Sequence, residues 1–278
     1  MVRIVTDSAA DFQPQEMEKL GITCIPLTVI FGQEEYQENV NLNKDQFYQL
    51  LLSSDQLPKT AQPSPQVLMD LFEDARDAGE EILYITLSSQ LSGTYQNAVM
   101  TCNMVDSPLC HVFDSRNATG GQRMLLEYAA KLRDEGMDAA GIMNALEQIR
   151  DRITLFACID TLEYLYKGGR ISHTTYKLGT LANIKPIISV EEGKVTIPAK
   201  AMGMRKGMDL LCKKVHEVQP DEEFPLYVMY TNNRSVAQTL VNRLAANDIF
   251  VSDDRIIQVG AAIGSHIGPD ACGLVYVH

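Results

Sequence analysis

The sequence of 278 residues has no tryptophan, no C-x-x-C pair among its six cysteines and no histidines at metal-binding spacing. Scattered cysteines of this kind are typical of reduced thiols in a cytosolic protein, so we expect neither a disulfide framework nor a metal site. No apolar run reaches the roughly 18 residues that a membrane-spanning helix needs. The chain starts on a strand pattern rather than a signal peptide, and we therefore expect a soluble, cytoplasmic protein.

Several motifs of nucleotide and hydrolase chemistry are also missing. The chain contains neither a P-loop, G-x-x-x-x-G-K-[ST], nor a dinucleotide fingerprint, G-x-G-x-x-G. The G-x-S-x-G elbow of α/β-hydrolases is absent as well. The net charge of −12 argues against nucleic acid as a partner. The sequence therefore gives no support to nucleotide binding by this chain itself.

The pattern of elements predicts two domains. Residues 1–152 carry all of the net negative charge and alternate strands with helices, which predicts an α/β domain with an open, mainly parallel sheet flanked by helices. Residues 153–278 are neutral and mix hairpins with helices, which predicts an α+β domain with a mixed or antiparallel sheet. A hydrophobic content of 45% is enough for a full core in a chain of this length.

The stretch Ile82–Ala98 organises the first half. It combines a buried strand, a serine-rich loop and a helix that begins at Thr94. Unpaired N–H groups at a helix start, together with hydroxyls such as that of Ser92, suit a small anion, and Gly93 allows close backbone approach. The alternative is that Ser92 only caps the helix.

Polar residues follow three predicted strands of the first half: Thr6-Asp7-Ser8, Ser88-Ser89 and Asp114-Ser115. In an open parallel sheet, ligands bind outside the carboxyl ends of the strands, so these endings mark the expected ligand edge. For Asp7 and Asp114 taken singly, we favour capping or loop bracing over ligand contact.

Other segments lead to local expectations. Three prolines make residues Pro58–Pro65 a rigid loop. Residues Tyr176–Ala182 have a helical pattern, and glycines around His266 indicate a tight loop that presents this histidine as a donor or a base. A histidine that only braces two loops is the alternative. Hydroxyls and one histidine beside much apolar surface suit a long apolar molecule with a small anionic head.

Seven segments together resemble the DegV family, in the fatty-acid-binding form that serves as the acyl-presenting subunit of a bacterial fatty acid kinase. The resemblance covers almost the whole chain. The segments are TDSAAD (Thr6–Asp11), TAQPSP (Thr60–Pro65), LSSQLSGTY (Leu87–Tyr95), VFDS (Val112–Ser115), TLEYLYKGGRIS (Thr161–Ser172), NIKPI (Asn183–Ile187) and HIGP (His266–Pro269).

The resemblance implies that a long-chain fatty acid is buried in the protein, with its carboxylate held by Thr60, by Ser92 with Gly93, and by His266. It also implies that a separate ATP-binding kinase subunit converts the carboxylate into acyl phosphate for phospholipid synthesis. Arg170 resembles an arginine linked to phosphoryl transfer or kinase docking. A transient contact with a membrane surface is a further expectation, and the only bound group expected is the fatty acid.

Three positions depart from the family pattern, and they bear on kinase coupling more than on lipid binding. Met202 replaces an arginine of K-x-R-G, and Ile267 and Asp270 alter the common H-T-G-P-G. Our hypothesis is thus a lipid carrier without catalytic residues of its own. The alternatives are a serine-type lipid or ester hydrolase that uses Ser92 and His266, and a lipid-responsive regulator that docks through Lys167–Lys214.

Overall fold

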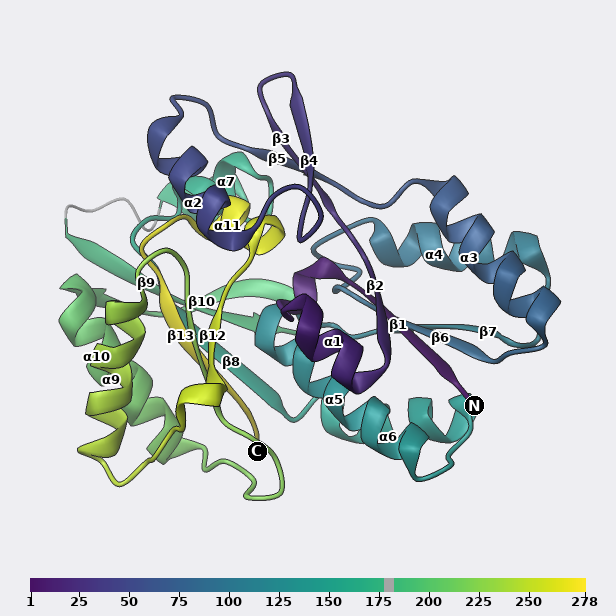
Figure 1. The fold of residues 1–278 in the computed structure, drawn as a ribbon. Coiled ribbons are helices and arrows are strands. Elements are labelled where there is room, and N and C mark those ends of the chain that lie inside the picture. Colours follow the sequence, from purple (N-terminus) through teal and green to yellow (C-terminus); the bar gives the residue numbers. More distant parts are fainter. Residues whose placement is uncertain (178–182) are drawn as a thin grey trace.

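The computed structural model describes residues 1–177 and 183–278, and Figure 1 shows their arrangement. The described strands are β1 (Arg3–Asp7), β2 (Ile22–Ile25), β3 (Thr28–Phe31), β4 (Glu34–Gln37), β5 (Lys59–Ala61), β6 (Ile82–Thr86), β7 (Cys110–Asp114), β8 (Ile153–Cys158), β9 (Ile184–Glu191), β10 (Lys194–Met202), β11 (Tyr227–Tyr230), β12 (Ile256–Gln258) and β13 (Cys272–Val277). The described helices are α1 (Pro14–Leu20), α2 (Lys44–Ser53), α3 (Pro65–Ala78), α4 (Thr94–Val105), α5 (Thr119–Asp134), α6 (Ala139–Arg150), α7 (Glu163–Lys167), α8 (His173–Lys177), α9 (Gly203–Glu217), α10 (Arg234–Ala245) and α11 (Ala261–Ile267).

The first large sheet is entirely parallel and has the order β2-β1-β6-β7. Its strands are apolar on both faces, as a sheet covered on two sides requires. Val5 and Tyr84 pack with α3 and α4, whereas their neighbours Ile4 and Leu83 belong to a cluster with α5 and α6. This confirms the predicted parallel sheet flanked by helices.

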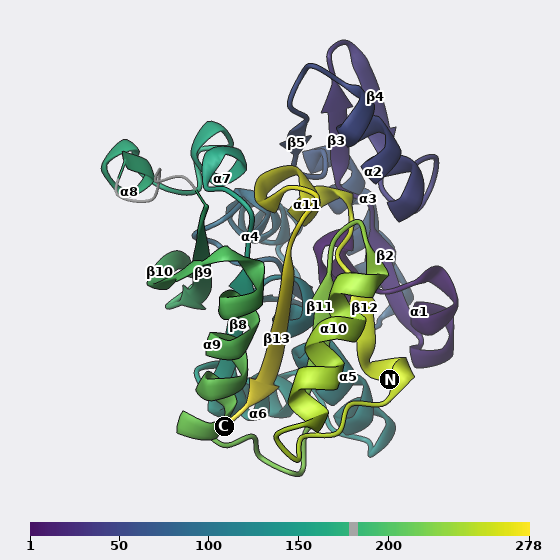
Figure 2. The same ribbon diagram turned by 90° about the vertical axis from the view of Figure 1, so that its left-hand side faces the viewer.

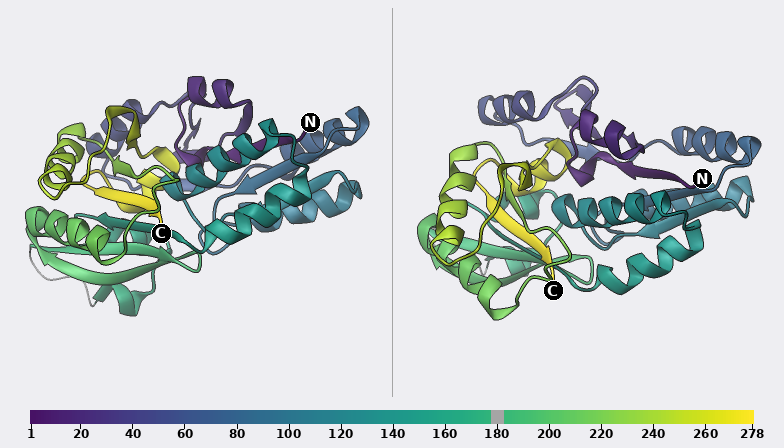
Figure 3. Two further views of the ribbon diagram at one scale, coloured as in Figure 1. Left: turned by 90° about the horizontal axis from the view of Figure 1, so that it is seen from below. Right: turned by 60° about the horizontal axis from the view of Figure 1, so that its bottom comes forward.

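The second large sheet has the order β10-β9-β8-β13-β11-β12. Only β11 and β12 pair in parallel; the other neighbours are antiparallel, so the sheet is mixed, as predicted. Helices α9 and α10 cover one face, and α5 contacts β8 and β13. Figure 3 shows the two large sheets side by side.

Every strand of the parallel sheet precedes residue 152, and every strand of the mixed sheet follows it. One core cluster nevertheless joins both halves, because Leu125 and Leu126 of α5 pack with Leu155 and Val275. The division into domains at residue 152 stays a prediction.

A third, small sheet has the order β4-β3-β5 and is antiparallel. Its β3–β4 hairpin was predicted. Strand β5 was not, because three prolines dominate the segment from Pro58 to Pro65. None of them falls within Lys59–Ala61, however, and these residues pair at an edge of β3, where a strand tolerates proline-rich flanks. Helix α2 packs beside this sheet and begins with a capping box at Asn43.

The expected loop around His266 is wrong, because this residue lies in the last turn of helix α11. Helix α11 contains glycine at position 264 because it packs closely on α2. A Cβ at Gly264 would lie 2.7 Å from atoms of Phe47 and Tyr48. Gly268, with φ +82°, ends the helix. The helix expected over residues 176–182 overlaps the end of α8 by two residues, and its remainder lies outside the described residues.

Helix α7 packs against α11, and α8 lies at the periphery of the molecule in the view of Figure 2. None of the helices in the described part of the chain is both long and apolar enough to cross a membrane. In residues 1–177 and 183–278, no group of three or more histidines, cysteines or acidic residues is placed to hold a metal ion. All six cysteines are free thiols.

Candidate functional site

An apolar cavity of about 370 Å³ lies between the loop after β6, helix α11 and strands of the mixed sheet. Its volume falls within the usual range of small-molecule sites, roughly 300–1,000 Å³. Side chains of the mixed sheet line it, among them Leu155 of β8, Ile188 and Val190 of β9, and Val195 of β10. These aliphatic walls can bury an apolar chain.

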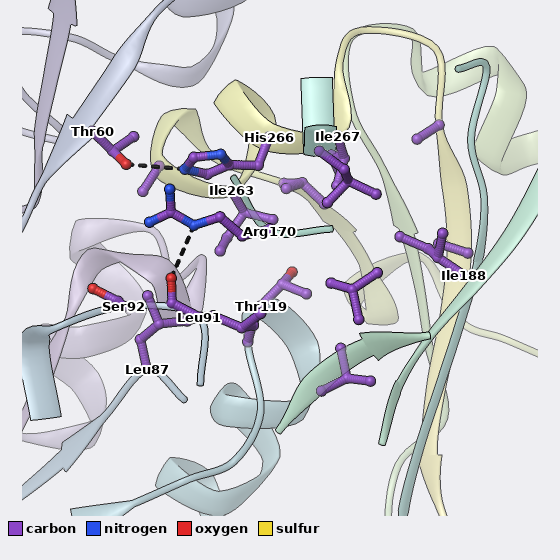
Figure 4. Close-up of a pocket in the computed structure, with 18 of the residues that line it drawn as sticks. Thr60, Leu87, Leu91, Ser92, Thr119, Arg170, Ile188, Ile263, His266 and Ile267 are labelled. Carbon is purple, nitrogen blue, oxygen red and sulfur yellow. Dashed lines mark hydrogen bonds between the residues drawn. The ribbon is translucent and has the colours of Figure 1, made fainter. Parts of the chain in front are cut away.

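Thr60, Ser92, Arg170 and His266 lie together at one end of the cavity, away from Ile188 (Figure 4). There the Thr60 hydroxyl lies 3.0 Å from Nε2 of His266. Nε of Arg170 donates to the Leu91 carbonyl at 3.0 Å, and Figure 4 shows its guanidinium between His266 and Leu91. Ser92 and Gly93 also line the cavity. The structure therefore brings all five residues singled out from the sequence to one cavity.

Hydrogen bonds to neighbouring strands fix the loop that carries Ser92. The Leu87 N–H donates to Asp7 at 2.8 Å, and the Ser89 N–H donates to Asp114 at 3.0 Å. Asp7 also accepts from the Ala9 N–H at the start of a 3₁₀ turn. Both aspartates thus cap and brace, as we expected of each singly. Burial raises the pKa of Asp7 to about 6, against the lowering effect of these bonds.

Ser92 has a local role that is compatible with ligand contact. Its hydroxyl lies 2.9 Å from that of Thr94, and it accepts from the Thr94 N–H at 3.3 Å. The residue at the N-cap position of α4 is Gly93, whose backbone has ordinary φ. A Cβ on Gly93 would lie 2.4 Å from the Gln62 side-chain oxygen, so glycine leaves room for Gln62. Ser92 therefore accepts from the start of α4 and also lines the cavity.

The imidazole of His266 is largely shielded from water. Its Nδ1 is buried and has no hydrogen-bond partner in the described part of the chain. A Cβ on Gly168 would lie 2.2 Å from this nitrogen, so the first glycine of the K-G-G-R turn makes room for the imidazole. Burial, assisted by the positive charge of Arg170, lowers the pKa of His266 to about 3. The ring is thus neutral at physiological pH.

Arg170 is the only lysine, arginine or acidic residue among the described residues that line the cavity. It forms no salt bridge with any carboxylate in residues 1–177 or 183–278. Burial lowers its pKa, but an arginine stays charged. The family resemblance linked this residue to phosphoryl transfer or kinase docking and did not place it beside Thr60 and His266. The available signal was the pair of glycines before Arg170, of which Gly169 has a φ of +76°.

The hydrolase alternative requires a serine paired with a base. The Ser92 hydroxyl bonds to Thr94, whereas Nε2 of His266 faces Thr60. In the described residues no carboxylate bonds to Nδ1 of His266 to orient the ring, as a catalytic triad would require. No feature of this geometry favours hydrolysis.

The three departures from the family pattern lie in different places. Ile267 lines the cavity and contributes to its apolar wall. Met202 is 56% exposed at the end of β10, and Asp270 is exposed after α11. Two of the departures therefore lie on the outside of the molecule, where they leave the cavity unchanged.

Comparisons with known proteins agree with one another. The model of the DegV family matches residues 1–278. A DegV domain-containing protein of Caldanaerobacter subterraneus subsp. tengcongensis is 32% identical over 276 residues, which is 99% of this chain and 98% of the relative.

Solved structures show the same fold over the whole chain. A fatty-acid-binding DegV family protein from Thermus thermophilus superimposes with a TM-score of 0.89 at 26% identity, covering 100% of this chain and 99% of that one. DegV from Bacillus subtilis, a fatty acid binding protein, gives 0.85 at 28% identity and covers 99% and 98%.

Proposed function

The chain belongs to the DegV family, and from this premise we propose that it binds a long-chain fatty acid in the cavity, with the carboxylate at the Arg170 end. The family relatives from Thermus thermophilus and Bacillus subtilis are fatty-acid-binding proteins and share its fold. The proposal extends that ligand class to this chain.

One observation carries the proposal: Arg170 has no carboxylate partner among the described residues, although it faces a largely apolar cavity. The guanidinium donates to the backbone carbonyls of Leu91 and Gly168, but neither carbonyl supplies the negative charge that balances a cation removed from water. A fatty carboxylate would supply that counter-ion and would accept from the hydroxyls of Thr60 and Ser92. Neutral His266 would share the same site as a hydrogen-bond partner.

The aliphatic walls account for the other end of the ligand. Burial of each methylene contributes about 0.8 kcal/mol, so a long tail against Leu155, Ile188 and Val190 would provide most of the affinity. The few polar groups would then select an acid over other lipids. This division of labour is usual in small-molecule sites.

We further propose that the protein acts in the cytoplasm and presents the carboxylate to a separate ATP-dependent kinase, which forms an acyl phosphate for phospholipid synthesis. The family resemblance supports this step, and so does the location of Arg170, which would stabilise negative charge on the phosphoryl group as it did on the carboxylate. A transient contact with a membrane surface would deliver the lipid. The chain itself would carry no catalytic residue.

Native mass spectrometry of freshly purified protein tests the lipid proposal, followed by organic extraction of the released molecule. We expect one long-chain fatty acid per chain. The variant Ser92→Ala/Thr60→Ala should retain less lipid, because each hydrogen bond to a charged group contributes roughly 1.5–3 kcal/mol. A suitable control is Met104→Ser, because the Met104 side chain of α4 is exposed and does not line the cavity. Wild-type occupancy in the double variant would refute the head-group assignment.

A further inference from the structure

Helix α11 is held at both ends by residues of the small sheet and its loops. At the carboxyl end, Thr60 of β5 contacts His266 at 3.0 Å. At the amino end, the Glu38 carboxylate, directly after β4, accepts hydrogen bonds from the N–H groups of Ala261 and Ala262. Figures 1 and 2 show α11 beside α2 and this sheet. Because β4 and β5 both pair with β3, the two contacts belong to one rigid unit.

Both oxygens of the buried Glu38 carboxylate accept hydrogen bonds within the protein. Its side chain is buried, with 1% of its surface exposed, and its second oxygen accepts from the Ser8 hydroxyl at 2.7 Å. A Cβ on Gly260 would lie 2.1 Å from a Glu38 oxygen, so the helix start tolerates no larger residue there. A carboxylate at a helix N-terminus also interacts favourably with the helix dipole. In the described residues no arginine or lysine forms a salt bridge with Glu38.

Helix α2 anchors the residues that lead into α11. Nζ of Lys44 donates to the Gln258 carbonyl at 2.7 Å, and the Tyr48 hydroxyl donates to the Val259 carbonyl at 2.9 Å. The Asp11 carboxylate accepts from the Gly260 N–H at 2.8 Å. These contacts fix the approach to α11, but Glu38 alone bonds to the first N–H groups of the helix itself.

From these contacts we propose that Glu38 is a positioning residue for the acid head group: it fixes the axis of α11 and thereby holds His266 against Thr60 at the polar end of the cavity. The proposal rests on the proposed fatty-acid function, because it assigns Glu38 a share in the recognition of the carboxylate. Glu38 itself is not among the residues that line the cavity, so it would act through α11 and not by touching a ligand.

The removal of Glu38 should therefore weaken the binding of an acid more than the binding of an uncharged lipid of the same length. We would measure the affinities of hexadecanoic acid and 1-hexadecanol for the wild type, Glu38→Ala and Glu38→Gln. Glu35→Ala is the matched control, because Glu35 is an exposed glutamate of β4, the strand that leads into Glu38. We expect Glu38→Ala to weaken acid binding at least tenfold and alcohol binding less than threefold. Glu38→Gln should recover most of the loss, since its amide oxygen still accepts from Ala261.

A purely structural role would give a different result, in which both lipids lose affinity by the same factor; that outcome, or no loss at all, would overturn the proposal. If the wild type binds neither lipid, the fatty-acid function itself fails. A second measurement then still tests Glu38. In lipid-free protein, NMR should show the pKa of His266 move from about 3 toward its ordinary value in Glu38→Ala and stay unchanged in Glu35→Ala. If Glu38→Ala does not fold, Glu38→Asp shortens the carboxylate's reach by one methylene and replaces it in both measurements.

Discussion

The Thr60 hydroxyl lies 3.0 Å from Nε2 of His266, although 206 positions separate the two residues in the sequence. The contact joins the small sheet to helix α11 at the end of the cavity where Ser92 and Arg170 also lie. A hydroxyl both donates and accepts, so Thr60 can orient the neutral imidazole and still bond to a ligand oxygen. The geometry of this pair underlies the predictions that follow.

The first prediction concerns the hydroxyls. Thr60→Val keeps the branched shape and removes the hydroxyl, so fatty-acid affinity should fall about tenfold or more, as the loss of a bond to a charged group implies. Ser92→Ala should act in the same direction. Isothermal titration with hexadecanoic acid measures both effects. Thr196→Val, on β10, is a matched control that removes a hydroxyl outside the cavity. Unchanged affinity in Thr60→Val would contradict the proposed contact.

The second prediction concerns Arg170, which has no carboxylate partner in the described residues. Arg170→Gln should abolish most of the preference for hexadecanoic acid over 1-hexadecanol, because it removes the counter-ion and leaves the aliphatic walls intact. Lys167→Gln serves as the control, since Lys167 is an exposed cation of α7 whose partner is Glu163. Competition between the two lipids gives the preference directly. A preference that survives in Arg170→Gln would show that another group balances the charge.

The third prediction separates the two glycines of the K-G-G-R turn. Gly168→Ala should displace the imidazole of His266, because the new Cβ would lie 2.2 Å from Nδ1. Acid affinity should fall about as far as in Thr60→Val. Gly169→Ala has no atom within 4 Å of its Cβ, but its φ of +76° costs roughly 1–2 kcal/mol. It should lower unfolding stability in urea and leave the acid preference unchanged. Equal binding losses in the two variants would argue against a specific role for Gly168.

Sequence patterns predicted the two large sheets because their signals are local. Strands such as Ile82–Thr86 are rich in apolar residues and fully buried. Helix starts such as Ser64-Pro65 have standard capping chemistry, here with the Ser64 hydroxyl accepting from the Val67 N–H. Helix α11 was missed for a non-local reason. Its Gly264 is there for close packing on Phe47 and Tyr48, which the sequence around it does not show.

The same limit applies to the site. Thr60, Ser92 and His266 were singled out by resemblance or by local chemistry, and they do line one cavity. The location of Arg170 depends on where the turn at Gly169 directs the chain, and its lack of a carboxylate partner depends on the whole fold. The sequence did not indicate the role of Glu38 either. A glutamate that follows an exposed strand has the pattern of a surface residue, and only the structure shows that it is buried.

The fourth prediction addresses hydrolysis. A fluorophosphonate probe should not label Ser92, because its hydroxyl faces Thr94 rather than a histidine base. Intact-protein mass spectrometry after incubation measures labelling, and a known serine hydrolase in the same experiment verifies that the probe is active. Stoichiometric modification that disappears in Ser92→Ala would favour the hydrolase over the carrier.

The fifth prediction concerns the pKa of His266, which NMR can measure directly. Burial and Arg170 lower its pKa to about 3, against an ordinary value near 6.5, so its ring protons should not titrate between pH 5 and 8 in lipid-free protein. NMR of selectively labelled histidine measures this. A bound carboxylate would favour the protonated ring, so its pKa should rise when hexadecanoic acid is added.

The lowered pKa also fixes how stability depends on pH. Above pH 6.5 the ring is neutral in both folded and unfolded chains, and the contribution of His266 to stability is fully present. As the pH falls from 6.5 toward 3, the unfolded chain binds a proton that the folded chain does not, and the contribution is lost. Between pH 7 and 5 the wild type should therefore lose about 2 kcal/mol more than His266→Gln, which has no proton to bind there. Urea unfolding at both pH values measures the difference. Equal losses of unfolding free energy in the two proteins would show that the pKa of His266 is not lowered in the folded chain.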